Sequence, residues 1–153
     1  MLIGRYGDTT GQPYIEGLVS LPRLGIQAVQ VSFLVDTGAG RCILSAVDAK
    51  AMGIASADLI GDYPVYGIGG ADTCFEEEAY LAFVDEATGR ISYYRVILLI
   101  GKREPGGGQT LPSILGREIL HRWRMFYFPR DPEPSLQFEV VSDDLSLDSG
   151  YRA

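Results

Sequence analysis

The sequence predicts a mostly β protein with one or two short helices. Residues 28–35 first alternate between apolar and polar side chains and then become continuously apolar. This pattern is typical of a strand whose end is buried on both faces. Similar segments recur along the chain, separated by turns that contain glycine or proline. The length of 153 residues fits one domain that can bury a core without disulfides or a metal.

The expected strands follow in order. They cover residues 14–21, 27–35, a long hairpin over 63–84, then 91–100, 124–128 and 136–141. Residues 85–89 (Asp-Glu-Ala-Thr-Gly) predict a turn, and residues 102–112, with three consecutive glycines and two prolines, predict a surface loop. We expect residues 1–141 to form the domain and residues 142–153 to form a flexible acidic tail.

Two short helices are expected. Ser45 can cap a helix over residues 46–52, with Gly53 just past its end. Residues 118–123 predict a second helix.

Composition and charge argue against several functions. The net charge of −7 disfavours nucleic-acid binding, which requires clustered Lys and Arg. The longest apolar run, residues 96–100, is far shorter than the roughly 20 residues that span a bilayer. The first residues do not resemble a signal peptide, so we expect a cytoplasmic protein without membrane insertion.

Cysteine and histidine usage is equally restrictive. Cys42 and Cys74 are expected to be free thiols in or near the core. With His121 as the single histidine, a histidine-based metal site or catalytic triad is not expected. We therefore expect no metal and no cofactor.

The segment that suggests chemistry is Asp36-Thr37-Gly38-Ala39, which follows the apolar run of residues 33–35. A carboxylate at the end of a buried strand is costly unless it has partners, and the glycine permits a tight turn with exposed N–H groups. The same tripeptide also suits a simple Asx-type turn, so this motif alone leaves a structural role open.

Two later motifs favour a catalytic role. Val65-Tyr66-Gly67-Ile68-Gly69-Gly70 lies at the tip of the expected hairpin, and Ile114-Leu115-Gly116-Arg117 precedes the second helix. With these three motifs in this order, the sequence resembles the retropepsin family, the retroviral-type aspartic proteases and their cellular and bacterial relatives. The resemblance extends over residues 14–141.

The resemblance implies a closed, barrel-like retropepsin fold with its active site at the two-fold axis of a homodimer. Asp36 would be the catalytic residue, contributed once by each chain, and the substrate would be a peptide or protein. Thr37, Gly38 and Ala39 would support the catalytic loop. Residues 66–70 (Tyr66, Gly67, Ile68, Gly69 and Gly70) would form a flap over the substrate, and Ile114, Leu115, Gly116 and Arg117 would support the loop from behind.

The chain departs from the viral pattern at Gly40, where an acidic residue usually pairs with the arginine equivalent to Arg117. The partner of Arg117 is therefore left open, and Arg41 is either a charge at the cleft rim or an ordinary surface arginine. Tyr66 is expected to pack on the sheet, with a hydrogen bond inside the flap as the alternative. The strands after the second helix look more like those of the cellular and bacterial relatives.

A second Asp-Ser-Gly at residues 148–150 lacks a preceding buried run and is followed by only three residues. We expect it not to be catalytic, so the second carboxylate must come from another copy of the chain. The alternative is an inactive peptide-binding or scaffolding domain of the same fold, or, more remotely, an unrelated β-barrel binding module.

Overall fold

A computed structural model of the chain describes residues 1–67, 70–102, 111–130 and 132–148. The described part is dominated by β-strands. Its two α-helices are short: α1 (Ala46–Ala51) and α2 (Arg117–Leu120). Two 3-10 turns, η1 (Pro22–Leu24) and η2 (Ser56–Asp58), complete the helical part. The mostly β fold expected from the sequence is confirmed.

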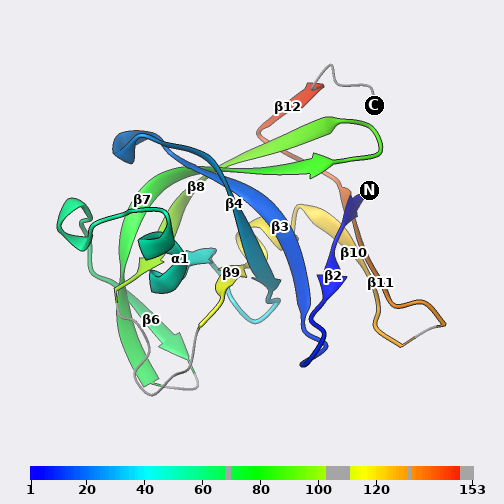
Figure 1. Cartoon of the computed structure of the whole chain (residues 1–153), viewed down its shortest axis with the longest axis horizontal. Helices are drawn as coiled ribbons and strands as arrows, with labels where there is room; N and C mark the ends of the chain where they lie inside the picture. Colours follow the sequence, from blue (N-terminus) through cyan, green and yellow to red (C-terminus); the bar gives the residue numbers. More distant parts are fainter. Residues whose placement is uncertain (68–69, 103–110, 131, 149–153) are drawn as a thin grey trace.

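The core of the fold is a closed ring of strands. Its members are β3 (Pro13–Leu21), β4 (Ile26–Val35), β5 (Ile43–Leu44), β7 (Gly70–Asp85), β8 (Arg90–Gly101) and β9 (Ser113–Leu115). The hydrogen-bonded order β8-β5-β9-β4-β3-β7 is closed by direct pairing of β7 with β8. Figure 1 shows the ring with β6 (Tyr63–Gly67) extending β7 at the lower left and β2 (Arg5–Tyr6) beside β3. Closure protects most strand edges from other chains.

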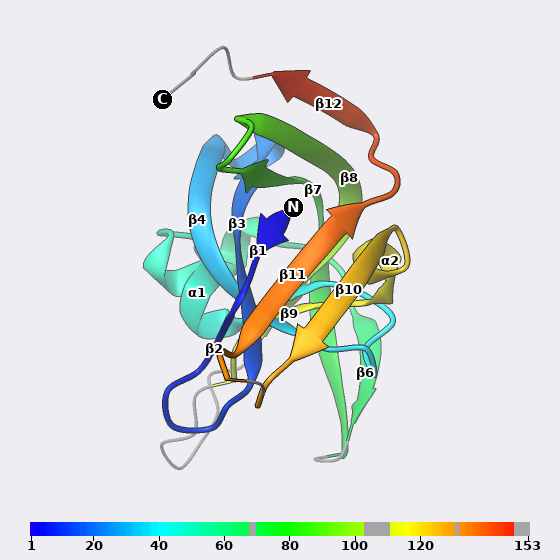
Figure 2. The same ribbon diagram turned by 90° about the vertical axis from the view of Figure 1, so that its right-hand side faces the viewer.

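A second sheet lies beside the ring. It contains β1 (Leu2–Ile3), β11 (Ser135–Val140) and β10 (Trp123–Phe128), in that order. Figure 2 shows this sheet facing the viewer, with α2 next to β10. Trp123 joins the two sheets because its ring packs edge-on against Phe83 of β7, at 4.8 Å between centroids. Its indole N–H also donates to the Tyr94 hydroxyl at 2.7 Å.

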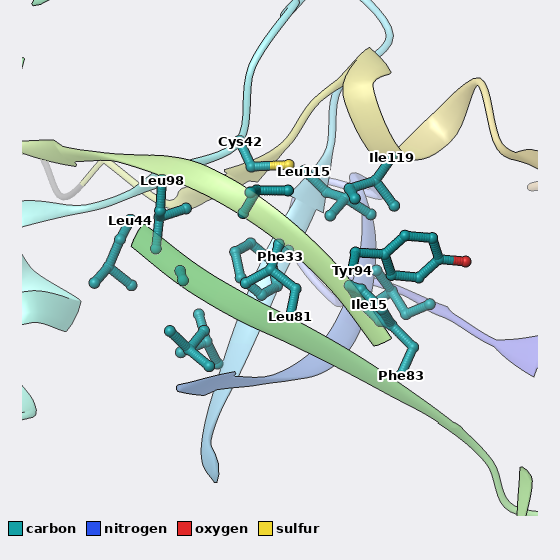
Figure 3. Close-up of a cluster of buried hydrophobic side chains, with 14 of the residues drawn as sticks. Ile15, Phe33, Cys42, Leu44, Leu81, Phe83, Tyr94, Leu98, Leu115 and Ile119 are labelled. Carbon is teal, nitrogen blue, oxygen red and sulfur yellow. The ribbon is translucent and has the colours of Figure 1, made fainter. Parts of the chain in front are cut away.

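The hydrophobic core fills the ring and the space under the second sheet. Phe33 and Phe83 pack together at its centre, next to Tyr94. Figure 3 shows these rings among aliphatic side chains from several strands. Cys42 and Cys74 are both buried and neither is in a disulfide, as the sequence predicts.

The expected strands and helices agree with the structure at most positions. The helix after Ser45 forms, and the Ser45 hydroxyl accepts the Asp48 N–H at 3.1 Å. The second helix is shorter and earlier than predicted: it covers 117–120, and Trp123 already belongs to β10. The expected loop over 102–112 falls mostly on residues 103–110, which lie outside the described residues.

The C-terminal segment differs from the flexible tail expected over 142–153. Leu145–Asp148 form strand β12, which pairs antiparallel with β8. The Asp144 N–H donates to the Tyr93 carbonyl at 3.0 Å, and Arg122 pairs with the Asp144 carboxylate at 2.8 Å. Acidic residues there meet basic side chains of the domain, a complementarity that the local composition does not reveal. Residues 149–153 lie outside the described part.

A buried carboxylate anchors η1 to the ring. Glu77 on β7 is 4% exposed, and Arg23 donates to both of its oxygens, at 2.9 and 2.7 Å. We predict that Arg23→Ala lowers the melting temperature by several degrees, because it leaves a buried charge unpaired. Arg5→Ala, which breaks the exposed Arg5–Glu16 pair, should have little effect in the same thermal scan. Equal shifts for the two variants would contradict this prediction.

No helix among the residues that the structure describes is long and apolar enough to cross a membrane.

Candidate active site

Asp36 directly follows strand β4, whose end is paired with β9. β4 and β9 run parallel, with Val35 opposite Leu115. The Asp36 N–H donates to the Leu115 carbonyl at 3.1 Å, so the backbone of Asp36 continues this pairing by one residue. Because Val35 and Leu115 are both buried, the position of Asp36 is fixed by the core.

The Asp36 side chain is oriented by the turn that follows it. Its Oδ1 atom accepts the Gly38 N–H at 2.8 Å, and the Asp36 carbonyl accepts the Ala39 N–H at 3.2 Å. This is the Asx-type turn that the sequence allows. A Cβ atom at Gly38 would lie 3.1 Å from Oδ1, so glycine keeps that contact uncrowded. Asp36 and Ala39 are half-buried, while Thr37 and Gly38 are exposed. The turn therefore fixes the carboxylate and leaves it within reach of a ligand.

Residues 114–117 support this loop, which we call the Asp36 loop (residues 36–40). Ile114 and Leu115 form β9 beside the end of β4. The Arg117 N–H donates to the Ala39 carbonyl at 2.8 Å, and the Glu118 N–H donates to the Gly40 carbonyl at 3.1 Å. The start of α2 thus binds the loop through its first free N–H groups. Two motifs separated by almost eighty residues form one hydrogen-bonded unit.

Gly116 is required by the close approach of the two segments. A Cβ atom built there would lie 2.4 Å from the Arg41 carbonyl oxygen and 2.9 Å from the Ala39 carbonyl oxygen. Its φ of −97° is open to any residue, so the need for glycine is steric. The Gly116 N–H donates to the Cys42 sulfur at 3.4 Å.

Arg117 has no acidic partner at position 40 and binds a main-chain carbonyl instead. Its Nη1 atom donates to the Thr37 carbonyl at 2.9 Å. A Cβ atom at Gly40 would lie 3.5 Å from Arg117 Nη2, so the guanidinium occupies the side of the loop where an acidic side chain would project. The Thr37 carbonyl therefore accepts the Arg117 hydrogen bond that an acidic side chain at position 40 would otherwise accept.

The second glycine-rich motif lies on the hairpin of β6 and β7. The two strands pair from Tyr63–Cys74 to Gly67–Gly70. Tyr66 is 79% exposed, so the expectation that it packs on the sheet is wrong. Ile68 and Gly69 lie outside the described residues. Figure 1 shows the hairpin extending toward the lower side of the ring, the same side toward which β4 runs.

Comparison of the chain with solved structures identifies similar proteins. A retropepsin-like aspartic protease from Rickettsia conorii superposes with a TM-score of 0.50 and 19% sequence identity, over 90% of this chain and 89% of that chain. The chain has the retropepsin fold. The protease of EIAV, in complex with the inhibitor HBY-793, matches with a TM-score of 0.44 and 16% identity, over 75% of this chain and 90% of that chain. Comparison with protein-family models gives no match, and comparison with curated proteins gives none either.

Within this retropepsin fold, Arg41 ties the Asp36 loop to other parts of the molecule. Its guanidinium donates to the Ile97 carbonyl at 2.7 Å, lies 3.7 Å from the Glu118 carboxylate and stacks over the Tyr63 ring at 4.8 Å. Tyr63 begins β6, so Arg41 connects the loop with the base of the hairpin. Neither of the two roles considered for Arg41 from the sequence included this contact.

Glu118 of α2 also supports the chain just after the Asp36 loop, a role that was not predicted from the sequence. Its Oε1 atom accepts the Cys42 N–H at 2.6 Å. Because α2 is a single turn, its sequence shows no helical periodicity from which the direction of the Glu118 side chain could be predicted. Burial raises the pKa of the Cys42 thiol far above its usual range, so Cys42 is a neutral packing residue and not a nucleophile.

Among the described residues, no group of three or more His, Cys, Asp and Glu side chains is arranged to hold a metal ion. The chemistry that this site offers is that of an oriented carboxylate in a rigid loop.

Proposed function

We propose that the chain is an aspartic endopeptidase that acts as a homodimer, with Asp36 of each copy as the catalytic residue. The observation that carries the proposal is the Asp36 loop: a half-buried carboxylate, oriented by the Gly38 N–H, in a loop bound from behind by the start of α2. The retropepsin fold, which the chain shares with a retropepsin-like aspartic protease from Rickettsia conorii, supports the proposal.

The second carboxylate must come from another copy. Asp148, the other candidate, lies at the end of β12 and pairs in register with Arg90. It has no preceding buried strand like that of Asp36, because Leu145 and Leu147 are exposed. A two-fold axis beside the Asp36 loop would supply the missing group with the same geometry.

Two such carboxylates about 3 Å apart cannot both ionise and therefore share one proton. The ionised carboxylate takes a proton from a water molecule, whose oxygen attacks the peptide carbonyl carbon. The protonated carboxyl gives its proton to the carbonyl oxygen, which yields a tetrahedral diol. Proton transfer to the amide nitrogen then releases the amine as the C–N bond breaks.

The surrounding residues take supporting roles in this proposal. The exposed Thr37 is available to contact the second copy. Arg117 keeps the loop closed through its bond to the Thr37 carbonyl. The hairpin tip, residues 66–70, would cover an extended peptide, and the exposed Tyr66 would border it. The cytoplasmic location expected from the sequence remains a prediction.

Activity should depend on protein concentration more steeply than first order. A site built from two chains is lost when the dimer dissociates, so the rate per chain should fall on dilution below the dimer dissociation constant. Digestion of a peptide library at several pH values and protein concentrations measures this. A constant rate per chain across the monomer–dimer transition seen by sedimentation would rule out a shared site.

The inactive-domain alternative makes the opposite prediction for the same library. A peptide would bind and remain intact at acidic and neutral pH, and no product would form at any protein concentration.

A further inference from the structure

The hairpin of β6 and β7 receives little support from the rest of the sheet. β7 pairs with β8 from Cys74 to Asp85, whereas the hairpin pairing runs from Tyr63–Cys74 to Gly67–Gly70 and so continues past the ring. Within the described residues, β6 pairs with β7 alone. A two-stranded ribbon is only marginally stable by itself. The placement of the hairpin therefore depends on side-chain contacts at its base.

Two contacts attach the base of the hairpin to its surroundings. Lys102 forms an ion pair with Asp62 and lies over the Phe75 ring, 4.7 Å from its centroid. The Glu76 N–H donates to the Ile60 carbonyl at 3.0 Å. These contacts join the hairpin to the end of β8 and to the segment that precedes β6.

Arg41 makes a further contact with the hairpin, and it directly follows the Asp36 loop. Its guanidinium lies over the Tyr63 ring, 4.8 Å from the centroid. Tyr63 pairs with Cys74, the residue at which β7 begins to pair with β8, so this stack lies where the hairpin leaves the ring. A planar guanidinium stacks on an aromatic face in a way that a lysine ammonium cannot reproduce.

The guanidinium is itself held in place by two other elements. Its Nη2 atom donates to the Ile97 carbonyl of β8 at 2.7 Å, and its Nε atom lies 3.7 Å from the Glu118 carboxylate of α2. Glu118 is fixed in turn because it accepts the Cys42 N–H at 2.6 Å. The Arg41 and Glu118 side chains are 28% and 24% exposed, so water screens this pair less than a surface pair. The Tyr63 ring therefore packs on a cation positioned by the helix that also binds the Asp36 loop.

We propose that Arg41 is a positioning residue, which fixes the hairpin relative to the Asp36 loop and thereby sets the affinity for peptide. This inference rests on the proposed function, in which the hairpin tip covers an extended peptide. Asp36 is oriented by a different contact, the Gly38 N–H. Loss of the Arg41–Tyr63 stack should therefore weaken binding of the substrate and of the transition state alike, which raises KM and leaves kcat unchanged.

The test separates the stack from the charge of Arg41. Arg41→Lys keeps a cation beside Glu118 and loses the planar stack, while Tyr63→Leu removes the ring and leaves Arg41 intact. Each should raise KM roughly fivefold to tenfold at the parent kcat. The double variant should lose no more than either single variant, because both changes remove the same contact. Tyr63→Phe, which keeps the ring, should restore the parent KM.

Tyr80 and Arg95 provide the matched control. They lie directly opposite each other on β7 and β8, in the part of β7 that belongs to the ring. Tyr80→Leu and Arg95→Lys should therefore leave both KM and kcat at the parent values. Parent kinetics in Arg41→Lys and Tyr63→Leu would overturn the proposal. A fall in kcat at unchanged KM, or losses that multiply in the double variant, would overturn it as well.

A binding measurement separates this inference from the proposed function. The probe is a peptide selected from the library by its binding to the Asp36→Asn protein, in which no cleavage is expected. Its dissociation constant should rise by the same factor when Arg41→Lys or Tyr63→Leu is added. If it does so while the parent cleaves nothing, the positioning role stands and the function is wrong. If the parent cleaves in an Asp36-dependent way but the dissociation constant stays unchanged, the positioning role is wrong and the function stands.

Discussion

Replacing Asp36 with asparagine should reduce peptide cleavage by roughly a thousandfold or more. The amide keeps the size of the carboxylate and still accepts the Gly38 N–H through its oxygen, so the loop geometry is retained. It can neither take a proton from water nor share one with the second copy. Peptide turnover by purified parent and variant, at matched concentrations and several pH values, measures the loss.

Two controls make this result specific. Asp58→Asn makes the same chemical change at an exposed carboxylate on η2 and should leave turnover unchanged. The Asp36→Asn protein should also show the parent melting temperature and the parent sedimentation behaviour. Turnover by Asp36→Asn at the parent rate would exclude Asp36 as the catalytic residue.

Replacing Gly116 with alanine should destabilise the protein strongly, because the new methyl group would meet main-chain atoms. The new methyl group would lie 2.4 Å from the Arg41 carbonyl oxygen and 2.7 Å from its carbon, and both atoms belong to the main chain. No side-chain rotation relieves this clash, so the Asp36 loop and α2 must move apart. We expect a loss of about 3 kcal/mol in unfolding free energy, or about 10 °C in melting temperature.

Gly40→Ala, in the same loop, is the matched comparison. A Cβ atom at Gly40 meets only Arg117 Nη2 at 3.5 Å, an ordinary contact with the end of a flexible side chain. Its backbone φ is not positive, so alanine is not strained there. Thermal unfolding should therefore rank Gly116→Ala far below Gly40→Ala. Equal stability of the two variants would show that the two segments do not cross as closely as described.

The elements that could be predicted from the sequence are those whose signals are local. β3, β4 and β8 follow from alternation and apolar runs, and α1 follows from its Ser45 cap. The second helix was predicted over residues 118–123, but α2 is a single turn that starts directly after Gly116. Trp123, which the prediction included in the helix, is the first residue of β10. β5 and β9 were missed because strands of two and three residues carry no periodicity of their own.

The sequence by itself determined the fold class, the buried thiols and the candidate residues Asp36, Gly116 and Arg117. These depend on residue types in a short window, where composition and spacing carry the information. Only the tertiary structure decided how the candidates meet: Arg117 binds the Thr37 carbonyl, Glu118 accepts the Cys42 N–H, and Arg41 donates to the Ile97 carbonyl. Such relations join segments distant in the chain, and they exist only after the core has folded and fixed where each strand ends.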